Sequence, residues 1–247
     1  MKEGTATIIP NLTEKYLNSI VKLDSRLFDY FQNSIQVDNS LTRQLVSFQA
    51  NKKQPTYRWY KYKEAFSSSL VKHLLQKFDL PQGIVFDPFT GVGTTLFASS
   101  EIGYDSEGIE LLPVGIQVIH NTLNAKRRLK ESDLSRILEW KEDHPWKFSN
   151  HKETINYLNI TKSAYSKETE ESIGKYLFEI NKENPVVRGI LFFVLLCILE
   201  SISFTRKDGQ YLRWDYRSGR RKGQNTFDKG LILNFEEKGE TFHRFVV

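Results

Sequence analysis

The segment Asp87-Pro88-Phe89-Thr90-Gly91-Val92-Gly93-Thr94-Thr95 directly follows the short apolar run Ile84-Val85-Phe86 and precedes a helix-like segment. Gly91 and Gly93 are spaced so that a chain leaving a buried strand can turn tightly and approach a ligand, because glycine accepts a positive φ without a Cβ clash. A ligand at this turn would meet free amides at a helix N-terminus. The segment therefore predicts a strand, a ligand-binding turn and a helix in succession.

The residues after the second glycine separate three kinds of nucleotide-binding turn. A phosphate loop of the Walker type would continue with Gly-Lys-Ser/Thr, which this chain lacks. A dinucleotide-binding turn would have Gly or Ala three residues after Gly93, where this chain has Leu96. Both alternatives are weaker than a third, in which the turn binds a cofactor that carries an amino acid.

Polar side chains around the turn suit such a zwitterionic cofactor. Asp87 ends the first predicted strand, where a carboxylate can face an ammonium group, and Thr94 and Thr95 can offer hydroxyls to a carboxylate. Glu110 ends a second strand-like segment, Glu107-Gly108-Ile109-Glu110, where its carboxylate can accept both hydroxyls of a ribose. Together these residues favour S-adenosylmethionine over a phosphate-rich cofactor.

These residues resemble the motifs of the DNA amino-methyltransferases, which methylate adenine N6 or cytosine N4. The first motif of that family, Asp-Pro-Phe-x-Gly-x-Gly-Thr-Thr, is matched at every fixed position from Asp87 to Thr95, and Gly108-Ile109-Glu110 corresponds to the second. In circularly ordered members a further motif precedes the first and helps to hold the methionine end of the cofactor; the segment from Tyr60 to Ser67 resembles it. The resemblance covers about residues 57 to 128.

The resemblance implies a set of residues that bind S-adenosylmethionine. They are Tyr62, Lys63, Phe66, Asp87, Pro88, Phe89, Thr90, Gly91, Gly93, Thr94, Thr95, Glu110 and Leu111.

The same family needs an Asp/Asn/Ser-Pro-Pro-aromatic motif, which holds the target amine and stacks on the flipped base. The seven prolines of this chain are never adjacent. The nearest segments are Asp143-His144-Pro145-Trp146, with one proline, and Asn184-Pro185-Val186, without the aromatic residue. We therefore assign no catalytic residue, and we expect the cofactor-binding half of a split enzyme whose second subunit supplies the motif. Two alternatives stay open: a non-catalytic regulatory protein that binds DNA or cofactor and derives from such an enzyme, and a truncation without a partner.

The stretch from Phe204 to Lys222 is strongly basic and interleaved with aromatic residues. Cationic side chains bind phosphates and aromatic faces stack on exposed bases. Residues from Ser203 to Trp214 also resemble a stretch that lies between the two halves of longer family members. Contact with double-stranded DNA and docking on an acidic partner subunit are equally favoured here. The candidate DNA-binding residues are Arg206, Lys207, Arg213, Trp214, Arg217, Arg220 and Arg221.

Composition limits the remaining possibilities. A chain of 247 residues with 39% hydrophobic residues can bury a core, and a net charge of +5 permits a polyanionic partner. The single cysteine, Cys197, lies in an apolar run and predicts a packed thiol rather than a nucleophile. The histidines show no metal-ligand spacing, so no metal site is expected. No signal segment is apparent and the longest apolar run, Ile190 to Leu199, is short for a bilayer, so we expect a cytoplasmic protein without membrane contact.

The order of patterns predicts an α/β protein. Strand, helix, strand and helix from Ile84 to about Leu129 indicate a right-handed parallel unit. We expect a Rossmann-like methyltransferase sheet with a parallel core and added helices, incomplete without a partner chain. The expected regions are a helical N-terminal region (1–56), an S-adenosylmethionine-binding α/β core (57–130), a helical insert or cover (131–183), and a buried helix followed by the basic aromatic loop and a C-terminal strand (184–247).

Overall fold

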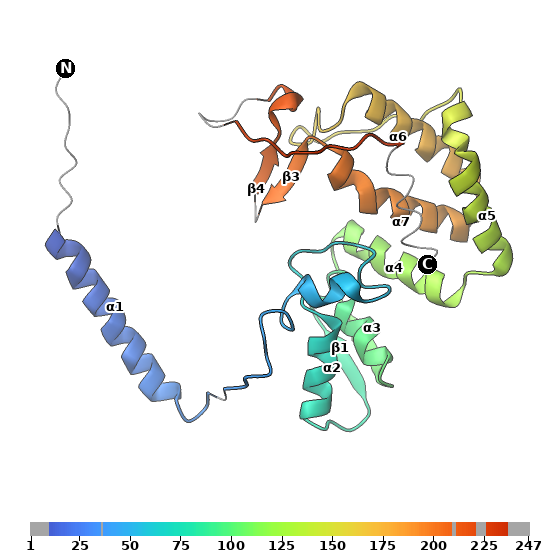
Figure 1. Cartoon of the computed structure of the whole chain (residues 1–247). Helices are drawn as coiled ribbons and strands as arrows, with labels where there is room; N and C mark the ends of the chain where they lie inside the picture. The colour runs from blue at the N-terminus through green and yellow to red at the C-terminus, as the bar shows by residue number, and fades with distance from the viewer. Residues whose placement is uncertain (1–9, 36, 209–210, 221–225, 237–247) are drawn as a thin grey trace, which may run out of the picture. The chain divides into compact units, whose positions relative to one another are not determined.

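The computed structural model describes residues 10–35, 37–208, 211–220 and 226–236 (Figure 1). The chain divides into two compact units, Met1–Thr42 and Arg43–Val247, which are taken separately below.

The smaller unit contains one long helix, α1 (Pro10–Phe31). Its apolar residues recur at helical spacing, and the helix lies inside the helical N-terminal region expected over residues 1–56. The large apolar side chains of this helix from Tyr16 onward are more than two-fifths exposed. They include Tyr16, Leu17, Ile20, Val21, Leu23, Leu27 and Phe28.

The strand-turn-helix segment lies in the larger unit, within a run of five elements. These are α2 (Ser68–Lys77), β1 (Ile84–Asp87), α3 (Thr94–Ser100), β2 (Asp105–Gly108) and α4 (Pro113–Arg127). Strands β1 and β2 pair in parallel, with Ile84 opposite Asp105 and Asp87 opposite Gly108. The predicted parallel strand-helix-strand arrangement is therefore present, and the described residues give this sheet two strands.

The second strand is shorter than predicted, because it ends at Gly108 rather than Glu110. Two further backbone hydrogen bonds follow the ladder: Ile109 donates to the Asp87 carbonyl at 3.0 Å, and Thr90 donates to the Ile109 carbonyl at 3.1 Å. The second of these bonds ties the chain after β2 to the glycine turn instead of to β1. Glu110 consequently stands in the loop beyond the strand.

The rest of the larger unit is mainly helical. It consists of α5 (Glu131–Asp143), α6 (Lys167–Ile180) and α7 (Pro185–Ile202), with short 3-10 helices at Phe48–Lys53, Pro145–Phe148 and Tyr216–Ser218. Helix α7, the buried helix expected after residue 184, begins with proline in its first turn, and Asn184 accepts hydrogen bonds from the amides of Val186 and Val187. Helix α7 is apolar on all sides, and it packs against α4, α5 and α6.

Helix α7 extends well beyond the ten-residue apolar run. Among the described residues it is the one helix that could cross a membrane by length and composition. Its side chains nevertheless form the centre of the hydrophobic core, since Val187 and Leu191 have no exposed surface and Phe193 and Val194 have 2% each. Burial on several sides is typical of the core helix of a folded domain.

Aromatic side chains join α5 and α6 to a segment far along the chain. Trp140, Trp146, Tyr176 and Phe235 lie with ring centroids 5.3 to 6.0 Å apart. Their polar atoms are paired: the indole of Trp140 donates to Glu183 at 2.8 Å, and the phenol of Tyr176 donates to the Leu191 carbonyl at 2.9 Å. Phe235 thus fixes the extended segment that follows the basic region onto this core.

The basic region forms an antiparallel pair, β3 (Thr205–Asp208) and β4 (Tyr211–Trp214), with Arg206 opposite Arg213. We call these two strands the basic hairpin. The described residues that follow, 226–236, contain an isolated bridge between Phe227 and Asp215 but no strand. Residues 237–247, where the predicted C-terminal strand could also fall, lie outside the described residues.

Candidate functional site

The glycine turn between β1 and α3 has the backbone geometry expected of it. Gly91 has φ 57° and Gly93 has φ 84°, both in the left-handed region that favours glycine. A Cβ atom on Gly93 would lie 2.9 Å from the ring of Phe97 and 3.0 Å from Ile119. Neither position therefore accepts a side chain without a change in the turn.

A third glycine, Gly115 in the first turn of α4, brings the turn and Glu110 together. A Cβ atom on Gly115 would lie 2.6 Å from the carbonyl oxygen of Gly91 and 2.8 Å from Cγ of Glu110. The absence of that atom lets α4 approach both segments. No sequence motif singles out Gly115, although it stands two residues after Pro113, the residue that begins α4.

The two predicted ligand carboxylates are oriented by neighbouring backbone amides. Asp87 Oδ1 accepts from the amide of Phe89 at 2.9 Å, and Glu110 Oε1 accepts from the amide of Leu112 at 2.6 Å. Both residues lie at the carboxyl ends of parallel neighbouring strands, where ligands bind in open α/β sheets. Within the described residues no hydrogen bond uses Asp87 Oδ2 or Glu110 Oε2, so each carboxylate has an acceptor available for a ligand.

The three threonines of the motif differ in exposure. Thr90 is buried and its hydroxyl donates to the Asp87 carbonyl at 2.9 Å, which closes the turn internally. Thr94 is also buried and lines a cavity together with Tyr57, Tyr60 and other side chains of the core. Thr95 is half-buried at the start of α3.

Three apolar residues of the predicted site complete the turn and its surroundings. Phe89 and Leu111 follow β1 and β2 closely and are almost fully exposed, at 89% and 85%. Pro88 lies between Asp87 and Phe89, within the span of the hydrogen bond that connects them. The exposed Phe89 and Leu111 are large apolar surfaces at the end of the sheet where the carboxylates lie.

The predicted segment Tyr60 to Ser67 lies against the glycine turn. The ring of Tyr62 is 3.4 Å from the position that a Cβ atom of Gly91 would take. Phe66 is partly exposed, and its carbonyl accepts from the side-chain amide of Asn51 at 3.1 Å. Ser67 caps α2 by accepting from the amide of Leu70 at 3.0 Å.

Charged residues of the same segment reach α7 and the basic hairpin. Lys63 Nζ lies 3.3 Å from Glu200 and donates to the Lys207 carbonyl at 2.8 Å. Glu64 accepts from Lys207 Nζ at 2.5 Å, and this hydrogen bond lowers the pKa of the Glu64 carboxyl. The structure thus brings the predicted cofactor segment into contact with the predicted DNA-binding hairpin, although Lys63 and Lys207 are 144 positions apart in sequence.

Within the basic hairpin, the cationic groups also have partners. Arg213 pairs with Asp208 at 2.5 Å, and both side chains are about half exposed. The guanidinium of Arg206 lies 4.6 Å above the ring of Phe227. Arg213, Lys207 and the ring of Tyr211 remain exposed.

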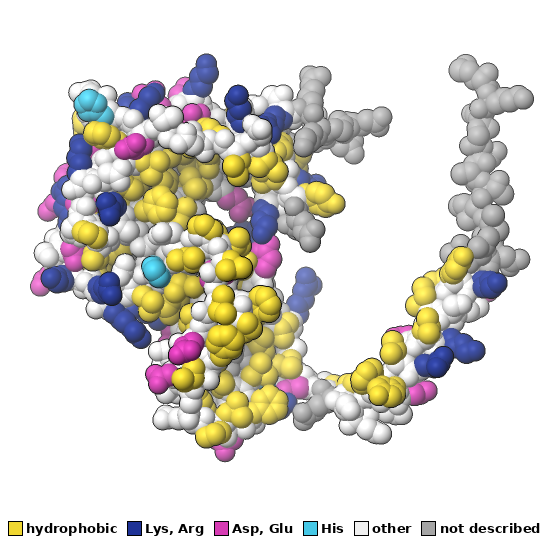
Figure 2. All heavy atoms as spheres, turned by 180° about the vertical axis from the view of Figure 1, so that it is seen from behind, with side chains coloured by type: hydrophobic (Ala, Val, Ile, Leu, Met, Phe, Trp, Pro, Cys, Tyr) yellow, Lys and Arg dark blue, Asp and Glu magenta, His cyan; other side chains and the backbone are white. Residues whose placement is uncertain are grey.

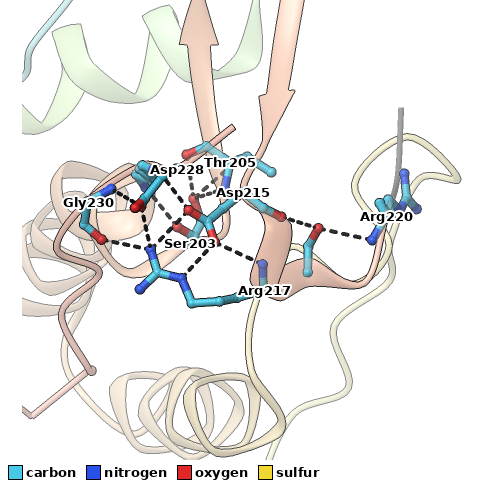
Figure 3. A network of polar contacts seen from close by, with 9 residues as sticks. Ser203, Thr205, Asp215, Arg217, Arg220, Asp228 and Gly230 are labelled. Atoms are coloured by element: carbon cyan, nitrogen blue, oxygen red, sulfur yellow. Dashed lines mark hydrogen bonds and ion pairs between the residues drawn. The ribbon is translucent and has the colours of Figure 1, made fainter. Parts of the chain in front are cut away.

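The residues after the hairpin form a polar network around the buried side chain of Asp215 (Figure 3). Asp215 has no exposed side-chain surface, and its carboxylate accepts from Arg217 Nε at 2.6 Å and Nη2 at 2.9 Å. The amides of Arg217 and Lys229 donate to the same carboxylate at 3.0 and 2.7 Å. The ion pair with Arg217 holds the pKa of Asp215 well below its usual value, and burial lowers the pKa of Lys229 to about 8.

Two other predicted DNA-binding residues pack against each other. The guanidinium of Arg220 lies 4.1 Å from the centre of the Trp214 ring, and Trp214 itself is 8% exposed. Arg220 also donates to the carbonyls of Asn159 and Ile160, at 2.9 and 3.3 Å. Arg221 lies outside the described residues. Sequence reasoning missed the role of Asp215, because the spacing Asp-x-Arg does not reveal that its carboxylate is buried.

The described residues contain no group of three or more His, Cys, Asp or Glu side chains that could hold a metal ion.

Comparison with known proteins gives consistent results. Residues 13–121 match the family model described as DNA methylase. The chain is 46% identical over 226 residues to the Type II methyltransferase M.AvaI of Nostoc sp., which is 91% of this chain and 47% of the relative. The figures are the same for M.AvaI of Anabaena variabilis. The Type II methyltransferase M.BsoBI of Geobacillus stearothermophilus is 38% identical over 191 residues, 74% of this chain and 36% of the relative.

The chain therefore spans about half the length of M.AvaI and less of M.BsoBI. No solved structure gives a significant match to this chain.

Proposed function

Because this chain belongs to the DNA amino-methyltransferase family, we propose that it is the cofactor-binding subunit of an enzyme that methylates an exocyclic amine of adenine or cytosine in DNA. The observation that carries this proposal is the convergence of Gly91, Glu110 and Gly115, which places an open turn beside an oriented carboxylate.

The residues present fit S-adenosylmethionine. Gly91 and Gly93 adopt the left-handed backbone conformation that lets the turn approach a ligand closely, and Asp87 and Glu110 each keep one acceptor oxygen. In this proposal Glu110 accepts from the ribose hydroxyls and Asp87 faces the ammonium group of the methionine moiety. The cofactor, when bound, supplies the methyl group.

The other predicted site residues act by positioning and by excluding water. Phe89 and Leu111 border the cofactor with apolar surface, and Pro88 and Thr90 shape the turn. Gly93, Thr94 and Thr95 start the helix that follows. Tyr62 and Phe66 flank the turn, and Lys63 holds their segment on α7. Holding two reactants in a productive orientation supplies a large share of the rate in such transfers.

The chemistry at the target base requires residues that these 247 do not contain. No two prolines are adjacent anywhere in the sequence, so an Asp/Asn/Ser-Pro-Pro-aromatic motif is absent from it. We assign that motif to a second polypeptide, which would hold the flipped base and its amine. We further propose that the sheet of this chain is Rossmann-like and that the second polypeptide completes it.

Double-stranded DNA is the proposed substrate, and the basic hairpin is the proposed contact. Arg213 and Lys207 are exposed and Arg206 is half-buried, so these three can reach phosphates after local rearrangement of their ion pairs. Arg217, Arg220 and Trp214 hold the hairpin in place through the buried network and the stacked pair.

Calorimetric titration of the chain with S-adenosylmethionine tests the cofactor assignment. We expect Glu110→Gln to weaken binding at least tenfold, because a ribose hydroxyl loses a charged acceptor. Glu107→Gln is the matched control, since Glu107 is exposed on β2 before the loop. Absence of binding by the wild-type chain, both alone and with the second polypeptide, would contradict the proposal.

A methylation assay tests whether cofactor binding and catalysis reside on two polypeptides. The chain alone should leave a DNA duplex unmodified, and addition of a polypeptide with the Pro-Pro motif should produce activity. Full activity of the chain alone would exclude the two-polypeptide arrangement.

A further inference from the structure

No described residue of the larger unit covers one face of the β1–β2 sheet. Ser106 on β2 donates its hydroxyl to the Leu96 carbonyl of α3 at 3.1 Å, so the face that carries Val85 and Ser106 packs on this helix. Ile84 and Phe86 alternate with Val85 and therefore point to the other face. Their exposed fractions are 63% and 57%.

The same face has a distinct distribution of charge. Asp105 and Glu107 are the register partners of Ile84 and Phe86, so they stand on this face beside them, and both are exposed. Figure 2, which views the molecule from behind, shows hydrophobic side chains gathered over the lower part of the larger unit with acidic side chains at their side. The surface is thus apolar over β1 and acidic over β2.

Parallel strands rarely leave a face in water. Parallel sheets are buried on both faces, and two strands alone bury too little surface to be stable. The sheet of the described residues has two strands, and each has an outer edge without a strand partner. A surface of this kind is completed by further strands and by a covering element.

We propose that the face formed by Ile84, Phe86, Asp105 and Glu107 is the docking surface for the second polypeptide. This inference rests on the proposed function for the identity of the occupant. The M.AvaI relatives match this chain over 47% of their length, so more than half of each has no counterpart here and is available to cover the sheet. The occupant places apolar side chains over β1 and basic side chains over β2, to complement the acidic pair.

Co-expression tests the surface. The tagged chain is produced together with a polypeptide that consists of the unmatched residues of the Nostoc M.AvaI, and the amount retained after purification is measured by mass ratio and sedimentation. We expect a one-to-one complex with the wild-type chain. Phe86→Glu should reduce retention at least tenfold, because it puts a charge into an apolar contact and beside two existing acids.

A matched variant separates this effect from a general effect of charge. Phe148 is 79% exposed in the 3-10 helix after α5, so Phe148→Glu makes the same change on another surface and should retain the complex. Equal retention by Phe86→Glu and wild type would overturn the proposal, as would the absence of any complex with the wild-type chain.

Measurements on the chain alone exclude other occupants. Phe86→Glu should leave its melting temperature and its sedimentation unchanged. A lower melting temperature would show that the chain itself covers the face, and conversion of a dimer into a monomer would show that a second copy does; either result overturns the proposal. Cofactor titration is independent of this surface. Loss of assembly with intact cofactor binding therefore supports the docking site, whereas assembly without cofactor binding contradicts the proposed function alone.

Discussion

Asp215 and Arg217 form a two-point ion pair in which the carboxylate is fully buried and the guanidinium is about one-third exposed. The guanidinium also donates to the Gly230 carbonyl at 2.7 Å, and the amide of Lys229 donates to Asp215. One carboxylate therefore connects the end of the basic hairpin to the segment that leads to Phe235.

Replacement of Asp215 should destabilise the protein. Asp215→Asn leaves Arg217 without its charged partner and weakens the hydrogen bonds from two amides. We expect a loss of about 2–3 kcal/mol in the free energy of unfolding, less than for a fully enclosed pair because solvent reaches the guanidinium. Urea denaturation measures the loss. Asp208→Asn, which breaks the exposed pair with Arg213, is the control and should cost under about 0.5 kcal/mol.

The same carboxylate should make stability dependent on acid. The pKa of Asp215 in the folded chain lies below its usual value, so the unfolded chain binds the proton more readily. The stabilisation is complete above about pH 4 and declines as the pH falls further. Melting temperatures between pH 5 and 2.5 should therefore fall more steeply for wild type than for Asp215→Asn. Parallel curves would show that this carboxylate does not govern acid stability.

A partly buried phenol should make stability dependent on base. Burial raises the pKa of Tyr165 to about 12, above the ordinary value near 10. A raised folded pKa contributes stability that is complete below pH 10 and is lost as the pH rises toward 12. Tyr165→Phe should reduce this decline in unfolding free energy measured between pH 9 and 11. Tyr216→Phe, at an exposed tyrosine, should leave the slope as it is in wild type.

The close approach at Gly115 gives a prediction about the cofactor site. Gly115→Ala introduces a Cβ atom at 2.6 Å from the Gly91 carbonyl, so the turn or Glu110 must move. We expect S-adenosylmethionine affinity to fall at least tenfold, although alanine alone favours a helix. Calorimetry of Gly83→Ala provides the comparison, because its Cβ would meet nothing closer than 3.9 Å. Unchanged affinity of Gly115→Ala would show that the convergence does not shape the site.

Salt dependence should identify the residues that bind DNA. Arg213→Ala should weaken duplex binding and lower the slope of log K against log salt by about 0.9 for each phosphate that the variant no longer neutralises. Fluorescence anisotropy at several salt concentrations gives both quantities. Arg188→Ala removes an exposed arginine of α7 and should change neither. If Arg188→Ala lowered the affinity and the salt slope as much as Arg213→Ala, DNA binding would depend on net charge and not on the basic hairpin.

Local sequence patterns were sufficient to predict much of the structure of the cofactor region. The strand Ile84–Asp87 and the positive φ of Gly91 and Gly93 were predicted, because each depends on residues within a few positions of one another. The parallel pairing was predicted from the order strand, helix, strand. The end of β2 was predicted two residues too late. The amide of Thr90, in the glycine turn, donates to the carbonyl of Ile109, so this carbonyl pairs with the turn and not with β1. The sequence of the β2 segment does not indicate this pairing.

Interactions between distant residues explain what the sequence analysis missed. Burial of Asp215 depends on Lys229, and the close packing at Gly115 depends on Gly91. Trp214 was predicted to be available for stacking on bases, yet its neighbour Arg220 covers the ring. Such pairings are set by how elements pack, and a single sequence read on its own carries no signal for them.

The adjacent residues Lys63 and Glu64 have a consequence for chain direction. The positive charge of Lys63 pairs with Glu200 on α7, and the negative charge of the next residue, Glu64, pairs with Lys207 on β3. Exposed pairs of this kind contribute little free energy. They do discriminate, because a segment that crossed in the opposite direction would put the Lys63 ammonium beside the Lys207 ammonium and the Glu64 carboxylate beside the Glu200 carboxylate. The order of one dipeptide thus encodes the direction in which a loop runs past its neighbours, and exchanging the two residues would erase that information without altering composition or net charge.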